Sequence, residues 1–174
     1  MTTIICATNR PNNQTQKIVD LYHQVLHEEG VDCRVLSMED LPSDFLYKDA
    51  YSDPGKAFLS FLDKYITASD SFVVISPEYN GSFPGVFKGF IDAFDPSFWR
   101  GKKVGLIGVS TGRAGNLRGM DHLTDVFHHM DVEVMPYKLP ISKLNDLFDG
   151  KRPRRELMEV LKFHALKFHR YLKK

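Results

Sequence analysis

Apolar and polar positions alternate along this chain in two repeating patterns. Short runs that are apolar at nearly every position are followed by longer segments in which apolar residues recur every three or four positions. The first pattern is typical of a strand buried on both faces, and the second is typical of an amphipathic helix. The predicted strands lie at 4–7, 33–38, 72–75, 104–109 and 132–135, and the predicted helices lie at about 14–29, 58–66, 85–92, 117–130 and 154–172.

The order of these elements is five alternating pairs of strand and helix. Strands buried on both faces, joined by helices, require a parallel sheet that is covered on both sides by right-handed crossovers. Five such units within 174 residues favour a flavodoxin-like fold over a barrel or a six-stranded dinucleotide-binding fold. We therefore expect one α/β domain over residues 1–174, a doubly wound five-stranded parallel sheet of order 2-1-3-4-5 in three layers, α/β/α.

In this sheet order the carboxyl ends of strands one, three and four meet at one edge, where open α/β sheets bind ligands. Polar loops follow these three strands, at 8–13, 76–84 and 110–116. The first precedes a helix N-terminus, which favours an anion, and it lacks the glycine patterns of dinucleotide and triphosphate sites. It therefore predicts a monophosphate site. A helix cap rich in Asn and Thr, without a ligand, is the alternative.

The other two loops are suited to a flat heterocycle. Prolines and glycines between Pro77 and Gly85 stiffen the second loop, so that it presents backbone groups edge-on to a ring. Gly112 and Gly115 allow the backbone of the third loop to approach a ligand closely. A fourth irregular stretch, from Pro42 to Pro54, is long and aromatic, and we expect it to be functional or interfacial.

Together the three loops resemble the NADPH-dependent FMN reductase family of flavodoxin-like proteins. That family shows G-S-x-R-x-x-S after the first strand, P-E-Y-N-x-S-x-P-G-x-x-K-x-x-I-D after the third and S-x-G-x-x-G-G-x-R after the fourth. The corresponding segments here are 7–13, 77–92 and 110–118, and the middle motif is nearly unbroken. Ala7, Asn13 and Asn116 stand where the family has Gly, Ser and Gly, which alters the phosphate site and the fit of the ring.

The resemblance implies an NAD(P)H-dependent oxidoreductase with FMN as cofactor and NADPH or NADH as co-substrate. A nicotinamide would give hydride to flavin N5 and then be replaced by a small-molecule acceptor, such as a quinone, an azo dye, a free flavin or a metal oxyanion. Because the flavin supplies the chemistry, no side chain is predicted to be catalytic. The predicted phosphate contacts are Thr8, Arg10, Asn13, Gln14 and Thr15, the ring contacts are Pro77, Glu78, Tyr79, Asn80 and Gly81, and the contacts to the pyrimidine edge are Ser110, Thr111 and Gly112.

Several roles and two other functions stay open. Glu78 either serves the site or pairs with Arg118, and Tyr79 either shields the ring or packs against the protein. The chain could instead be a flavodoxin-like electron carrier, although such carriers are strongly acidic and this chain has 23 Lys and Arg against 22 Asp and Glu. A phosphate- or nucleotide-binding domain without turnover is the other alternative.

Charge and composition narrow the list of partners. A net charge of +1 predicts neither nucleic acid nor membrane as partner. No leader or membrane-length apolar run is seen, so a cytoplasmic protein is expected, and the family resemblance implies a homo-oligomer, a dimer or a tetramer.

Cys6 and Cys33 are interpreted as buried thiols. His23 and His27 lack a third ligand, so no metal site is predicted, and His164 is expected to be packed or interfacial.

Overall fold

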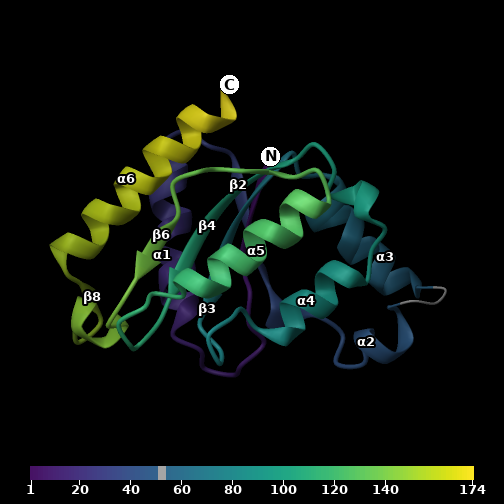
Figure 1. Cartoon of the computed structure of the whole chain (residues 1–174), viewed down its shortest axis with the longest axis horizontal. Coiled ribbons are helices and arrows are strands. Elements are labelled where there is room, and N and C mark those ends of the chain that lie inside the picture. Colours follow the sequence, from purple (N-terminus) through teal and green to yellow (C-terminus); the bar gives the residue numbers. More distant parts are fainter. Residues whose placement is uncertain (51–53) are drawn as a thin grey trace.

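The computed structural model describes residues 1–50 and 54–174, which form a sheet between two layers of helices (Figure 1). The sheet strands are β1 (Thr2–Cys6), β2 (Cys33–Ser37), β3 (Ser71–Pro77), β4 (Lys103–Val109), β5 (Glu133–Val134) and β6 (Leu139–Ile141). The α-helices are α1 (Thr15–Glu28), α2 (Phe45–Lys48), α3 (Lys56–Leu62), α4 (Gly85–Asp92), α5 (Leu117–His129) and α6 (Arg155–Leu172).

The order of the sheet is β2-β1-β3-β4-β5 with parallel pairing throughout, which confirms the predicted flavodoxin-like fold. Two short strands pair with the same side of β4. β5 pairs with the start of β4, and β6 pairs with its end, from Ile107 opposite Leu139 to Val109 opposite Ile141. The second of these strands was not predicted. It is three residues long and contains Pro140, which lacks a ladder donor and is tolerated only at such an edge.

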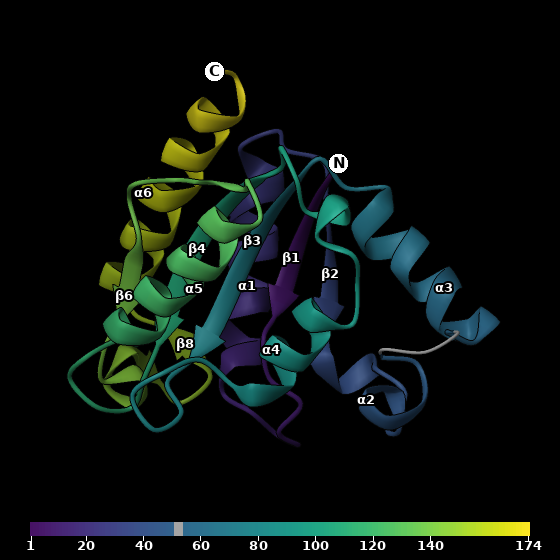
Figure 2. The ribbon, with the colours of Figure 1, turned by 45° about the vertical axis from the view of Figure 1, so that its right-hand side comes forward.

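Side chains of the central strands alternate between two apolar cores, one on each face of the sheet. Ile5, Val74 and Leu106 pack with α3, α4 and α5, whereas their neighbours Val73 and Ile107 pack with α1 and α6. Figure 2 shows α4 and α5 on one face of the sheet and α1 on the other. This alternation is why each of these strands is apolar at successive positions.

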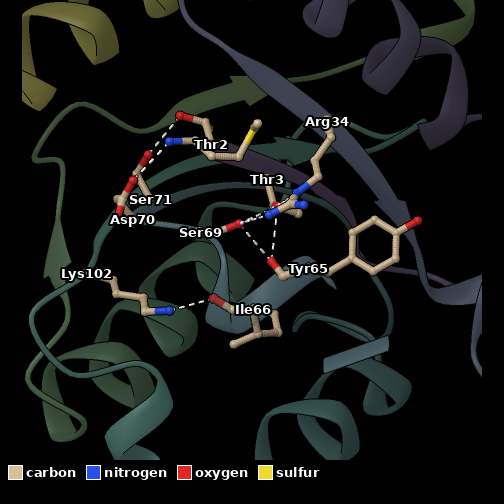
Figure 3. Close-up of polar contacts among 10 residues, drawn as sticks. Thr2, Thr3, Arg34, Tyr65, Ile66, Ser69, Asp70, Ser71 and Lys102 are labelled. Atoms are coloured by element: carbon tan, nitrogen blue, oxygen red, sulfur yellow. Dashed lines mark hydrogen bonds and ion pairs between the residues drawn. The ribbon is translucent and has the colours of Figure 1, made fainter. Parts of the chain in front are cut away.

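A polar network links residues at the amino ends of the strands (Figure 3). The hydroxyls of Thr3 and Ser69 lie 2.7 Å apart, and the Arg34 guanidinium donates to both, at 3.1 Å each. Lys102 Nζ donates to the Ile66 carbonyl at 2.6 Å. Because these groups satisfy one another, the network contributes to stability at this edge, whereas open α/β sheets bind ligands at the opposite, carboxyl edge.

Three short elements refine the predicted boundaries. The helix predicted at 58–66 is α3 continued by a π-helical turn, Asp63–Thr67. The irregular stretch predicted from Pro42 to Pro54 contains α2, and Tyr51 within that stretch lies outside the described residues. A small antiparallel hairpin, β7 (Phe148–Asp149) with β8 (Arg152–Pro153), precedes α6.

Candidate functional site

The first part of the site is the loop that joins β1 to α1. The Gln16 N–H is capped by Asn13 Oδ1 at 2.8 Å, and the Lys17 N–H by the Gln14 carbonyl at 3.2 Å. Among the contacts of the described residues, the N–H groups of Gln14 and Thr15 have no partner. They stand at the positive end of a 14-residue helix, which is a favourable place for an anion.

The side chains of this loop differ in whether they already have a partner within the described chain. The guanidinium of Arg10 is exposed and has no ion-pair partner within the described chain. Asn13 is engaged, because its Nδ2 donates to the Arg10 carbonyl at 3.1 Å and to Glu39 Oε1 at 2.6 Å while its Oδ1 caps α1. The side chain of Asn13 therefore caps the first turn of α1.

The second part is a tight hairpin at the carboxyl end of β3. Tyr79 and Ser82 exchange two backbone hydrogen bonds, of 2.9 and 3.0 Å. Asn80 and Gly81 form the turn with φ values of +51° and +76°, as a two-residue type I′ turn requires. The Tyr79 hydroxyl lies 2.8 Å from Thr8 Oγ1, so the hairpin is also tied to the first loop.

The third part is the loop after β4, which is held by its own serine and by the segment after β6. Ser110 Oγ accepts the Gly115 N–H at 2.9 Å and donates to the Gly112 carbonyl at 3.0 Å. The N–H groups of Lys143 and Leu144 donate to the carbonyls of Gly112 and Ser110, at 2.7 and 3.1 Å. A short 3₁₀ helix, Leu144–Leu147, thereby forms a wall of the site.

The three loops enclose a cavity of about 690 Å³, a volume within the range of small-molecule sites. Nine of the thirteen predicted site residues line it: Arg10, Asn13, Gln14, Thr15, Pro77, Glu78, Tyr79, Ser110 and Thr111. The other four do not line it. Thr8 is buried beneath the Tyr79 hydroxyl, Asn80 and Gly81 form the hairpin tip, and Gly112 lies beyond the rim.

Five lining residues were not predicted. Pro11, Asn12 and Val109 are chain neighbours of predicted residues, whereas Leu144 and Asn145 come from the 3₁₀ helix after β6. No sequence signal identified that helix, because it reaches the site through the unpredicted pairing of β6 with β4.

Glu78 is held by α5 rather than by an arginine. Its Oε2 accepts the backbone N–H of Asn116 at 3.3 Å. None of the ion pairs among the described residues joins Glu78 to Arg118. The carboxylate therefore lies at a helix N-terminus, where negative charge is favoured.

Neither cysteine has the character of a reactive thiol. Cys6 is buried beneath the first loop, and burial raises the pKa of its thiol to about 12. Cys33 is half-buried because β2 is an edge strand, and partial burial raises the pKa of its thiol to about 11. Both groups are protonated near neutral pH, so neither is a nucleophile there.

Two further features are absent from the described residues. No group of three or more His, Cys, Asp or Glu side chains is arranged to hold a metal ion. No helix in the described part of the chain is long and apolar enough to cross a membrane.

Two of the known proteins that the chain resembles are named as quinone reductases. The chain is 30% identical over 109 residues to a 2-hydroxy-1,4-benzoquinone reductase of Burkholderia sp, covering 54% of this chain and 60% of that protein. It is 33% identical over 155 residues to a quinone reductase of Pseudomonas putida, covering 84% of this chain and 80% of that protein. Several curated relatives are matched over only 49–64% of their own length, so the chain spans about half to two thirds of those proteins.

The fold is shared with solved flavoproteins. The flavoenzyme NAD(P)H:(acceptor) oxidoreductase FerB of Paracoccus denitrificans superposes with a TM-score of 0.75 at 22% identity, covering 97% of each chain. The sequence pattern described as NADPH-dependent FMN reductase matches residues 2–146, which is most of the chain. This protein therefore belongs to the NADPH-dependent FMN reductase family.

Proposed function

We propose that this protein is an FMN-dependent NAD(P)H oxidoreductase that passes two electrons from a nicotinamide to a small-molecule acceptor. The observation that carries the proposal is one cavity that combines a free helix N-terminus with two rigid backbone walls. The family to which the chain belongs, and relatives named as quinone reductases, support the same activity.

The residues present fit FMN. The unpartnered N–H groups of Gln14 and Thr15 and the free charge of Arg10 are suited to a phosphate. Pro77, Glu78 and Tyr79 on one side and Ser110 and Thr111 on the other would hold a flat ring between them. The flavin, when bound, supplies the hydride chemistry, and this chain's residues bind and orient it.

The proposal extends to the organisation of the protein. Residues 1–174 would act as a single FMN-binding domain, because both apolar cores pack against the same six-stranded sheet. We place the protein in the cytoplasm as a homo-oligomer, a dimer or a tetramer. Size-exclusion chromatography with light scattering would test the oligomer, and a monomeric mass at micromolar concentration would contradict it.

Anaerobic titration tests the activity. The FMN-loaded protein is mixed with NADH or NADPH, and the loss of yellow flavin absorption is followed before quinone, azo, flavin and metal-oxyanion acceptors are added. Bleaching by a nicotinamide and recovery by an acceptor are expected. Failure to take up FMN would contradict the proposal, and a yellow protein that neither nucleotide bleaches would indicate an electron carrier.

Replacing Arg10 with alanine is expected to weaken FMN binding by about 10- to 100-fold, since hydrogen bonds to charged groups contribute about 1.5–3 kcal/mol. The affinity for riboflavin, which has no phosphate, should stay the same. Flavin fluorescence quenching measures both. Arg113→Ala is the matched control, because Arg113 is exposed in the third loop and does not line the cavity. An equal loss of affinity for both flavins would contradict a phosphate contact.

A further inference from the structure

Asn116 has a backbone conformation that few residues adopt. It immediately precedes α5 with φ +60° and ψ +33°, in the left-handed region. Glycine enters this region freely, and asparagine is one of the few other residues that do so at low cost. The conformation explains why glycine suits this position, and it leaves open what the asparagine side chain adds.

The side chain of Asn116 is directed to the base of the hairpin that follows β3. It is completely buried, and its Nδ2 donates to the Ser76 carbonyl at 3.0 Å, to Ser76 Oγ at 3.2 Å and to the Pro77 carbonyl at 3.0 Å. Its backbone N–H donates to Glu78 Oε2. One residue of the third loop therefore contacts three consecutive residues of the second.

The Asn116 side chain packs closely against two glycines, Gly108 and Gly119. A Cβ on Gly119 would overlap Asn116 Oδ1 and would lie 2.8 Å from the carbonyl carbon of Ser82. A Cβ on Gly108 would lie 3.0 Å from Asn116 Cβ. Because neither neighbour carries a side chain, the start of α5 and the hairpin approach closely with the Asn116 amide between them.

Stability alone does not account for a polar side chain at this position. Asn116 Oδ1 is buried and has no hydrogen-bond partner within the described chain. A buried acceptor without a partner lowers the stability of the folded state. This penalty at Oδ1 offsets part of the stabilisation from the three hydrogen bonds of Nδ2. Those contacts end at Pro77, which lines the cavity with Glu78 and Tyr79.

We propose that Asn116 is a positioning residue that fixes the wall formed by Pro77, Glu78 and Tyr79, and that it thereby sets the affinity and the surroundings of the flavin ring. The inference rests on the proposed FMN function. Asn116 acts through the wall and does not itself line the cavity.

The test compares two variants with a matched control. Asn116→Gly keeps the left-handed backbone and removes the amide, whereas Asn116→Asp keeps the size and replaces the donor with a carboxylate that would face two carbonyls. Asp131→Gly is the control, because Asp131 is also left-handed, at φ +57°, and lies beyond the other end of α5. It reports the effect of an added glycine together with the loss of an exposed ion pair to Arg100, which contributes little to stability.

Two measurements distinguish positioning from general stability. FMN affinity, measured well below the melting temperature, is expected to fall about tenfold in Asn116→Gly and further in Asn116→Asp. In the FMN-free protein, exchange of the hydrogen-bonded backbone N–H groups of Glu78, Tyr79 and Ser82 is expected to become about tenfold faster, while exchange in α6 stays the same. The absorption spectrum of bound FMN should also shift.

The outcomes separate this inference from the proposed function. If Asn116→Gly melts at a lower temperature but keeps wild-type FMN affinity and wild-type exchange at Glu78, Tyr79 and Ser82, the residue is merely structural and the inference is wrong. If the wild type takes up no FMN, the proposed function fails. The exchange measurement then still tests whether Asn116 fixes the wall.

Discussion

Acidification from pH 7 to pH 3 is expected to destabilise the protein by up to about 5 kcal/mol through one side chain, His164. This histidine is completely buried between α6 and the sheet, and burial lowers its pKa from 6.5 to about 3, although the Leu106 backbone opposes the shift. This lowering of the pKa corresponds to roughly 5 kcal/mol at about 1.4 kcal/mol for each tenfold change in proton affinity.

The direction follows from which state binds the proton. Above pH 6.5 His164 is neutral in both the folded and the unfolded chain, so its titration does not affect stability. Between pH 6.5 and about 3 only the unfolded chain binds the proton, and the free energy of unfolding falls as the pH falls. In the folded state Nδ1 lies 2.7 Å from the Tyr22 hydroxyl, a hydrogen bond that the neutral imidazole makes without a charge.

Denaturant unfolding at several pH values would measure this dependence. His164→Asn retains an acceptor for Tyr22 and removes the titration, so its stability should fall less steeply between pH 6.5 and 4 than that of the wild type. His27→Asn is the control, because His27 is exposed on α1. Parallel pH profiles for the wild type and His164→Asn would show that His164 is not the responsible group.

The second large effect is expected from Gly108→Ala, which should lower the free energy of unfolding by about 3 kcal/mol. A Cβ at this position would overlap the Gly115 carbonyl oxygen and lie 3.0 Å from Met120 Cε. Overpacking usually costs about 1–3 kcal/mol, and the upper end is expected because a backbone carbonyl cannot rotate away. For a chain of this size the melting temperature should fall by roughly 6–12 °C.

The same substitution should displace the third loop of the site, since Gly108 is next to the last residue of β4. Thermal unfolding and FMN affinity can be measured on the same samples. Gly85→Ala is the matched control, because an added Cβ at Gly85 meets no atom within 4 Å. A Gly108→Ala protein with wild-type melting temperature would contradict the close packing of β4 against the third loop.

Local patterns were enough to predict the sheet and the position of the site. Runs such as Phe72–Ile75 are apolar at every position because both faces of β3 are covered, so burial on two sides is visible in the sequence itself. The Asn80–Gly81 turn is likewise local, since its positive φ values depend on the residue types. The order of the elements then placed three polar loops at one edge.

Contacts between distant segments were not predictable in the same way. The wall residues Leu144 and Asn145 depend on β6, a strand of three residues with a proline. The side chain of Asn13, a predicted phosphate contact, donates to Glu39, which lies 26 residues away along the chain. Both contacts depend on how distant segments pack together. Neither contact produces a periodic pattern of apolar residues in the sequence.

The sequence by itself determined the alternation of strand and helix, the order of the sheet and the edge at which ligands would bind, because these follow from which residues are apolar and where turns are allowed. Only the tertiary structure decided which loop groups remain free to bind. It showed that the N–H groups of Gln14 and Thr15 have no partner within the described chain, whereas the side chain of Asn13 is engaged, and that Asn116 is directed to the second loop. The physical reason is that a polar group serves a ligand only when no nearer partner in the folded chain satisfies it.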